Sequence, residues 1–167
     1  IGTLGARLDR DPVSGVYVVK HVYQSDPDRP DRKSPLAKQG VKEGESIVAV
    51  DGRDTAGAAA IGELLRNRAG RQTLLRVKSA DGASTRDVIV NPLTAAQDFD
   101  LRYHEWEFTR RLSVEKTSQG RFGYVHLRAM GNNDMDAWME QYYPVHNREG
   151  LIIDVRHNNG GNIDSWL

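Results

Sequence analysis

Two consecutive glycines near the end of the chain are the residues best suited to do chemistry through the backbone. Gly160-Gly161 follow an apolar run, residues 151–155, that predicts a strand, and the residues after them have the pattern of a helix start. Glycine permits positive φ and a close approach to the main chain, and free N–H groups at a helix N-terminus attract negative charge. Such donors can stabilise an oxyanion. The glycine pair alone favours an ordinary tight turn, and no Gly-Lys-Ser/Thr sequence follows to indicate a phosphate cradle.

Histidine is the other residue type here that could supply a base or a metal ligand. The chain has five histidines, which are His21, His104, His126, His146 and His157. None lies four residues from another histidine, and the chain has no cysteine, so the spacing predicts no metal site. His157 is close to the glycine pair, where a role in shaping the turn is favoured over contact with a substrate.

Two further polar features surround the glycines. Ser165 falls in the predicted helix and lacks the Gly-x-Ser-x-Gly turn that exposes a nucleophilic serine, so we do not expect it to be a nucleophile. Asp154 and Arg156 flank the end of the predicted strand, where a structural ion pair or cap is the default interpretation. The sequence around the glycines therefore offers backbone donors without an accompanying nucleophile or base.

The composition limits what such a site could belong to. The chain has 167 residues, 38% of them hydrophobic, which is enough to bury a core in one or two small domains. Acidic and basic residues number 23 each, so a net charge of zero does not favour nucleic acid or an anionic membrane as a partner. The absence of cysteine excludes disulfides and thiol catalysis. No apolar stretch approaches the ~20 residues of a membrane span, and no cofactor is predicted.

The first part of the chain, residues 1–93, reads as short strands with two helical segments. Apolar alternation and β-branched residues predict strands at residues 4–8, 15–22, 46–50, 73–77 and 86–90. A short helix begins at Ser34-Pro35 and ends at Gly40, and residues 58–68 have the pattern of an amphipathic helix. Asp51-Gly52 is the strongest signal for a two-residue turn.

The second part, residues 94–167, has the order of an α/β sheet. A charged and aromatic segment, residues 95–112, is predicted to be a helix or a linker. A strand at 122–127, a helix at 134–143 and a strand at 151–155 follow. The last strand is apolar throughout, as a strand covered on both faces would be. Strand, helix, strand and helix start is the beginning of an α/β sheet.

The first part resembles the PDZ domains of bacterial and archaeal proteases. The resemblance lies in Ser34-Pro35-Leu36-Ala37 through Gly44-Glu45 and in Ile47-Val48-Ala49-Val50-Asp51-Gly52. It implies an edge strand, residues 5–8, to which an extended peptide adds, and a facing helix, residues 58–68. A turn would capture the terminal carboxylate and apolar side chains would receive an apolar last residue. The implied peptide-binding residues are Gly2, Thr3, Leu4, Gly5, Ala6, Ile61, Leu64 and Leu65.

The second part resembles the tricorn-type branch of the C-terminal-processing serine peptidases, the S41 family. The matching segments are Arg102-Tyr103 with Trp106 and Arg110-Arg111, Gly123-Tyr124-Val125-His126-Leu127, Tyr142-Tyr143-Pro144, and Gly150 to Arg156 followed by Asn158-Asn159-Gly160-Gly161. The two resemblances together imply a mixed fold class. A PDZ-like β-barrel or sandwich with helices, residues 1–93, would precede the truncated first portion of an α/β peptidase core, residues 94–167.

The function implied by the resemblance is that of a serine endopeptidase or carboxy-terminal-processing peptidase. Gly161, and after it Gly160, would give an oxyanion-hole N–H, whereas the nucleophile and base would lie outside this chain. The missing initiator methionine and the abrupt end agree with such a piece, which should be inactive alone. The alternative is a PDZ scaffold that docks chain ends without catalysis. The expected partner is a peptide or protein substrate, the parent could be a homo-oligomer, and the tricorn branch favours the cytoplasm over the periplasm.

Overall fold

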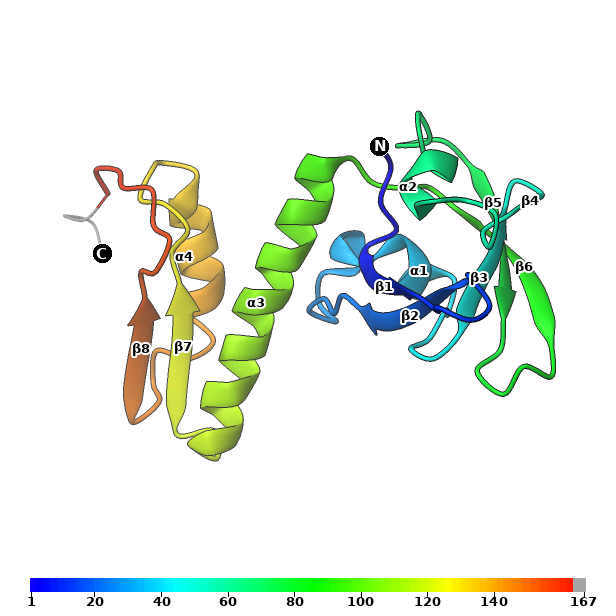
Figure 1. Cartoon of the computed structure of the whole chain (residues 1–167). Coiled ribbons are helices and arrows are strands. Elements are labelled where there is room, and N and C mark those ends of the chain that lie inside the picture. The colour runs from blue at the N-terminus through cyan, green and yellow to red at the C-terminus, as the bar shows by residue number, and fades with distance from the viewer. Residues whose placement is uncertain (164–167) are drawn as a thin grey trace. The chain divides into compact units, whose positions relative to one another are not determined.

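The computed structural model describes residues 1–163 of the chain (Figure 1). The chain forms two compact units, one covering Ile1–Glu105 and the other beginning at Trp106. The boundary lies within the long helix α3, which covers Ala95–Thr117. The domain boundary predicted at residues 93–94 stays a prediction, and each unit is described separately below.

The first unit is built on one antiparallel sheet. Its six strands are β1 (Ala6–Arg10), β2 (Tyr17–Val22), β3 (Ser46–Val50), β4 (Arg53–Asp54), β5 (Thr73–Lys78) and β6 (Thr85–Val90). The strand order is β1-β2-β3-β5-β6, and the short β4 pairs with β3. The sheet is not closed into a barrel, although an isolated bridge joins Thr3, before β1, to Leu93, after β6. The predicted mixed class with a PDZ-like sheet is confirmed, in the form of an open sheet.

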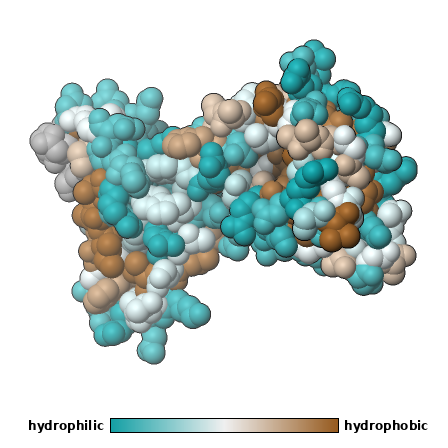
Figure 2. Space-filling model, viewed as in Figure 1, coloured by the Kyte–Doolittle hydropathy of each residue, from teal (hydrophilic) through white to brown (hydrophobic). Residues whose placement is uncertain are grey.

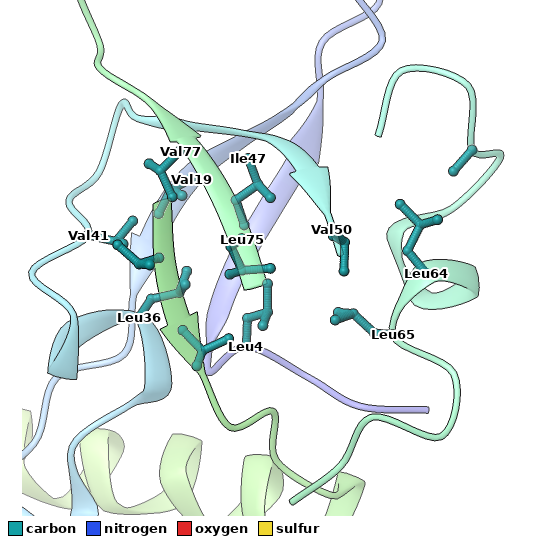
Figure 3. Packing of buried hydrophobic residues seen from close by; sticks show 13 residues of the cluster. Leu4, Val19, Leu36, Val41, Ile47, Val50, Leu64, Leu65, Leu75 and Val77 are labelled. Atoms are coloured by element: carbon teal, nitrogen blue, oxygen red, sulfur yellow. The ribbon is translucent and has the colours of Figure 1, made fainter. Parts of the chain in front are cut away.

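The core of this unit lies on one face of the sheet (Figure 3). In β5 the residues alternate, so that Leu75 and Val77 are fully buried while Leu74 is 40% exposed. Successive side chains of a strand point to opposite faces, which explains this period of two. Leu4 and Leu36 join the same cluster from the chain before β1 and from the first α-helix. The N-terminal turn is therefore fixed by packing as well as by pairing.

The first unit also contains three short helices. They are η1 (Pro30–Arg32), α1 (Pro35–Lys38) and α2 (Ile61–Leu64). Ser34 caps α1 by accepting a hydrogen bond from the Ala37 N–H, as its position before proline predicts. The helix α2 is much shorter than the predicted 58–68. Ala60 precedes it in extended conformation without a capping side chain, and Asn67 has a φ of 58°, so neither flank continues the helix.

The helix α3 covers Ala95–Thr117, which resolves the choice between a helix and a linker. It begins with a reciprocal cap, because the Gln97 N–H donates to the Thr94 hydroxyl and the Thr94 N–H donates to the Gln97 side chain. Its first turn is also attached to the first unit, since the Thr3 hydroxyl donates to Asp98 over 2.8 Å. None of the helices within residues 1–163 is long and apolar enough to cross a membrane.

The second unit contains a strand-helix-strand arrangement. Its elements after α3 are β7 (Phe122–His126), α4 (Asp134–Tyr142) and β8 (Gly150–Asp154). The two strands pair in parallel from Phe122 opposite Gly150 to His126 opposite Asp154. A small core of Val125, Leu127, Trp138 and Val145 lies between the strands and α4. Both strands therefore end at the same edge of the sheet.

The prediction that the last strand is covered on both faces is wrong for the described residues. Ile152 and Ile153 of β8 are 42% and 48% exposed, and Val155 beyond the strand is 50% exposed. Figure 2 shows apolar residues gathered along the β8 side of this unit. The apolar composition of the strand is real, but β8 pairs only with β7 within residues 1–163. Burial requires neighbouring elements, which the composition of one strand cannot supply.

Candidate functional site

The candidate site forms where the loops after β7 and β8 cross. The loop after β8 is tied to the loop after β7 by backbone hydrogen bonds from Met130 N–H to the Gly160 carbonyl, 2.8 Å, and from Asn162 N–H to the Met130 carbonyl, 2.8 Å. An isolated parallel bridge pairs Met130 with Gly161. Carboxyl ends of parallel strands are the usual position of sites in α/β sheets, because the loops there converge.

Gly161 occupies a position that only glycine can take. Its φ is 148°, and a Cβ placed on it would lie 1.9 Å from the Met130 carbonyl oxygen and 2.0 Å from the carbonyl carbon. Both are backbone atoms, which cannot turn aside as a flexible side chain could. Gly160 differs, because its φ of 81° also favours glycine but a Cβ added there would have nothing within 4 Å. The two adjacent glycines are therefore required for different reasons.

The N–H groups of the two glycines also have different environments. The Gly160 N–H donates to Oδ1 of Asn158 over 2.6 Å, so this donor is occupied. Among residues 1–163 no acceptor is bonded to the Gly161 N–H, and Gly161 is exposed. Of the two glycines, Gly161 is therefore the one whose N–H has no acceptor among the described residues. The helix expected after the glycines, together with Ser165, falls outside the described residues apart from its first positions.

Asp154 and Arg156 form an ion pair at the end of β8, as expected from their positions. Arg156 donates from Nε and Nη2 to the Asp154 carboxylate, with the shortest contact at 2.5 Å. Asp154 is 7% exposed and also accepts the hydroxyl of buried Tyr124 over 2.8 Å. The hydrogen bonds from Arg156 hold the pKa of the Asp154 carboxyl well below its usual range, against the opposing effect of burial. Burial raises the pKa of the Tyr124 phenol, and the bond to Asp154 raises it further.

Aromatic rings pack beside this ion pair. Trp106 has the rings of His126 and His157 edge-on at centroid distances of 5.0 and 5.4 Å, and the Arg156 guanidinium lies 5.0 Å from its centroid. His126 is buried and its Nδ1 lies 2.8 Å from the Asp154 carbonyl oxygen. His157 has a φ of 61°, which is uncommon for a residue other than glycine. Its geometry fits the expected role in the turn.

The remaining histidines lie apart from the glycines in the sequence and in their contacts. His104 contacts Arg32, and His146 bonds the Tyr143 carbonyl. His21 lies between two carboxylates, with Nδ1 2.8 Å from Glu43 and Nε2 2.6 Å from Glu105. Partial burial opposes protonation of His21, but the hydrogen bonds to Glu105 and Glu43 outweigh it and raise the pKa. Within residues 1–163 no group of three or more histidine or acidic side chains could hold a metal ion.

In the predicted peptide-binding turn, some backbone N–H groups donate hydrogen bonds within the fold and others do not. The Gly2 N–H donates to the Leu65 carbonyl and the Thr3 N–H to the Leu93 carbonyl, each over 2.9 Å. Among the described residues no acceptor is bonded to the N–H of Leu4 or Gly5. Two of the four turn donors are thus used in folding, and two face no acceptor within the part of the chain that the structure describes.

The side chains predicted to form the apolar pocket differ in their burial. Leu4, Leu64 and Leu65 are buried core residues, at most 6% exposed, whereas Ala6 and Ile61 pack on the core while remaining partly exposed. β1 is a terminal strand of the sheet, so its outer edge is available for strand addition. Three of these five side chains therefore pack in the core, and the contact of all five with a peptide stays a prediction.

Comparison with known proteins identifies the family. Residues 2–95 match the family model described as the tricorn protease PDZ domain. The chain belongs to the tricorn protease PDZ family. Residues 121–167 match peptidase family S41, so the tricorn PDZ region is followed by the start of an S41 core, as the sequence resemblance predicted.

Relatives of the tricorn type match along most of the chain. Tricorn protease homolog 1 of Streptomyces coelicolor is 38% identical over 165 residues, covering 96% of this chain and 15% of that protein. The tricorn protease of Thermoplasma volcanium is 31% identical over 156 residues, covering 92% and 15%. A crystal structure of the tricorn protease covers 99% of this chain and 16% of that one, with 29% identity and a TM-score of 0.85. The chain therefore spans 15–16% of the length of these proteins.

One residue of the site, Asn158, has contacts that its place in the sequence only partly predicts. The Asn158 side chain accepts a hydrogen bond from the Gly160 N–H through Oδ1. It also donates a hydrogen bond from Nδ2 to the Leu127 carbonyl over 2.8 Å. The sequence carries a signal for the first contact, because asparagine bonds its own backbone two residues on and Asn158 precedes Gly160 by two. The second contact joins residues 31 positions apart and has no local signal.

Proposed function

We propose that this chain is the PDZ region and the first part of the catalytic core of a serine peptidase that hydrolyses peptide bonds. The observation that supports this most directly is that the N–H of Gly161, an exposed residue, is bonded to no acceptor among the described residues, whereas the neighbouring Gly160 N–H is occupied. The relatives are named as tricorn proteases and the second part matches a peptidase family, which agrees with such a role. Peptide or protein chains are the proposed substrates.

In this mechanism Gly161 provides one donor of an oxyanion hole. Attack of a serine hydroxyl on the scissile carbonyl converts that carbonyl oxygen to an oxyanion, and a pre-oriented N–H stabilises it. The second donor is the N–H beside the serine. The serine and its base are supplied by other parts of the parent protein, so we expect the isolated 167-residue chain to hydrolyse no peptide.

Replacing the Gly161 amide by an ester in the parent protein is expected to lower kcat about 10²- to 10³-fold. Glycolic acid at position 161 removes the N–H without adding a side chain, so no Cβ is introduced against the Met130 carbonyl. KM should change little, because the donor acts on the transition state rather than on the bound substrate. Steady-state kinetics on a chromogenic peptide measures both constants.

The matched control is glycolic acid at position 160, which removes the N–H that already donates to Asn158. Its effect on kcat should be clearly smaller than that of the ester at 161. Equal kcat for the wild type and the 161 ester would refute Gly161 as the oxyanion donor. A parent protein without any peptide hydrolysis would leave the scaffold alternative.

We also propose that the PDZ unit docks peptide chain ends on the outer edge of β1. The N–H groups of Leu4 and Gly5 would receive the terminal carboxylate, and Ala6 and Ile61 would contact an apolar last side chain. Gly5 is essential to this turn, since its φ is 67° and a Cβ would lie 2.7 Å from the Ser34 Cβ and 2.8 Å from Leu101. Backbone conformation and packing therefore both keep this position as glycine.

Peptides that end in leucine or valine are expected to shift the backbone amide NMR signals of residues 2–8 and 61–65 in this chain. The same peptides with an amidated C-terminus should bind at least about tenfold more weakly, because the carboxylate is the charged group that the turn captures. Gly5→Ala should abolish binding, whereas Gly40→Ala, at a similar φ of 66° with nothing within 4 Å, should not. Equal binding of free and amidated peptides would contradict carboxylate capture, and no binding at all would favour a PDZ unit that only packs.

A further inference from the structure

We propose that Asn158 is a positioning residue, which fixes the loop so that the Gly161 N–H, and not the Gly160 N–H, faces the substrate. The inference rests on the proposed peptidase function and assigns a role to a side chain beyond the glycines. Asn158 is partly buried, and its amide group makes two hydrogen bonds of opposite sense. Each bond constrains a different part of the site.

The first bond removes a competing donor. Oδ1 of Asn158 accepts the Gly160 N–H over 2.6 Å, which orients the peptide plane between Asn159 and Gly160. Without this acceptor, Gly160 would present a second exposed N–H on a residue whose φ of 81° is held by no packing, since nothing lies within 4 Å of its Cβ position. The bond therefore restrains the glycine that packing does not fix.

The second bond anchors that restraint to the other loop. Nδ2 of Asn158 donates to the Leu127 carbonyl over 2.8 Å, directly after β7, and Leu127 is 1% exposed. The backbone of Asn158 is held as well, because its N–H donates to the Val155 carbonyl over 3.2 Å. The asparagine thus connects the loop after β8 to a residue fixed in the core of the second unit.

The direction of the Gly161 N–H follows from the neighbouring peptide plane. The Gly160 carbonyl accepts the Met130 N–H over 2.8 Å, so it points toward the loop after β7. In a trans peptide the N–H points opposite to the C=O, and the described residues include no cis peptide bond. The Gly161 N–H consequently points away from the loop after β7. Asn158 holds the preceding residue so that this plane does not rotate.

The test compares three variants in the full-length parent protein. Asn158→Ala loses both hydrogen bonds and is expected to lower kcat about 10- to 100-fold, less than removal of the donor itself, with KM changed by no more than about twofold. Asn158→Ser keeps a hydroxyl that can accept the N–H two residues on, and should recover much of kcat. Asn159→Ala is the matched control with unchanged kcat, since its side chain makes no hydrogen bond among the described residues.

Two further readouts separate positioning from a general loss of structure. Affinity for a peptide aldehyde, which forms a tetrahedral adduct with the serine, should fall by the same factor as kcat in Asn158→Ala. Affinity for the matching peptide amide, which forms no adduct, should stay unchanged. Hydrogen–deuterium exchange in fragments covering residues 155–162 should be faster in Asn158→Ala and restored in Asn158→Ser.

The outcomes distinguish this inference from the proposed function. An active parent whose Asn158→Ala variant keeps kcat and aldehyde affinity overturns the positioning role and leaves the peptidase function standing. Parallel losses of kcat and of peptide amide affinity also overturn it, because they indicate general disruption. A parent that hydrolyses no peptide overturns the peptidase function, and with it the role of Asn158. Loss confined to kcat and aldehyde affinity, with recovery in Asn158→Ser, supports it.

Discussion

Alanine at position 161 of the parent protein is expected to reduce kcat by at least about 10²-fold, whereas alanine at position 160 should reduce it by less than about tenfold. The added Cβ at 161 would lie 1.9 Å from the Met130 carbonyl oxygen. One of the two backbone segments must therefore move by about 1 Å or more to relieve the clash. That displacement moves the N–H proposed to bind the oxyanion. Steady-state measurement of kcat and KM for the two variants tests this prediction.

The Gly160→Ala variant is the control because it has the same change in the adjacent residue. Its φ of 81° costs alanine about 1–2 kcal/mol, but no atom lies within 4 Å to be displaced. Thermal unfolding of both variants should therefore show a modest loss at 160 and a larger loss at 161. Similar kcat and similar stability for the two would mean that the crossing of the loops at Met130 is looser than the structure shows.

Replacing Asp154 by alanine is expected to destabilise the second unit by about 2–4 kcal/mol. The change leaves the hydroxyl of Tyr124, which is 4% exposed, without its acceptor and removes the partner of Arg156. Tyr124→Phe is the matched control, since it deletes only one hydrogen bond and should cost about 1 kcal/mol. Urea unfolding followed by tryptophan fluorescence reports on this unit, because Trp106, Trp138 and Trp166 all belong to the second part of the chain.

The same carboxylate gives the stability of this unit a defined pH dependence. The pKa of Asp154 is depressed in the folded state, so its contribution is fully present above the unfolded pKa of about 3.9 and is lost as the pH falls toward the folded pKa. Unfolding free energy should therefore drop below about pH 4 in the wild type and drop less in Asp154→Ala. An equal drop in both would assign the acid sensitivity to other carboxylates.

Local signals in the sequence predicted several elements closely. β3 has the predicted bounds, residues 46–50, because β-branched residues are followed by Asp51-Gly52, whose φ values of 47° and 77° are both positive as a type I′ turn requires. A helix from residue 95 was one of the two predictions for that segment, although its end at Thr117 was not foreseen. Each of these features depends on residues within a few positions of one another, which is the range over which turn and cap preferences act.

Other features depended on residues far away in the chain, and there the sequence was a weaker guide. The apolar segment 151–155 correctly predicted a strand. The prediction that both faces of this strand are buried was wrong for the described residues, because burial depends on neighbouring elements. Leu4, Leu64 and Leu65 lie in the core of the first unit, which their local pattern did not show, and their contact with a ligand stays a prediction. An amphipathic pattern indicates an apolar face and cannot say which partner covers it.

For the candidate site, the sequence by itself determined that two glycines follow a strand and that Asn158 precedes the first of them by two residues. Only the tertiary structure decided which glycine has its N–H bonded within the described residues and which lacks room for a side chain. That decision comes from Met130 and Leu127, about thirty residues earlier in the chain, whose backbone groups meet the loop only because β7 and β8 pair in parallel. Such pairing brings distant residues together through a shared sheet edge, and no local propensity encodes which of two identical residues will lie against the other loop.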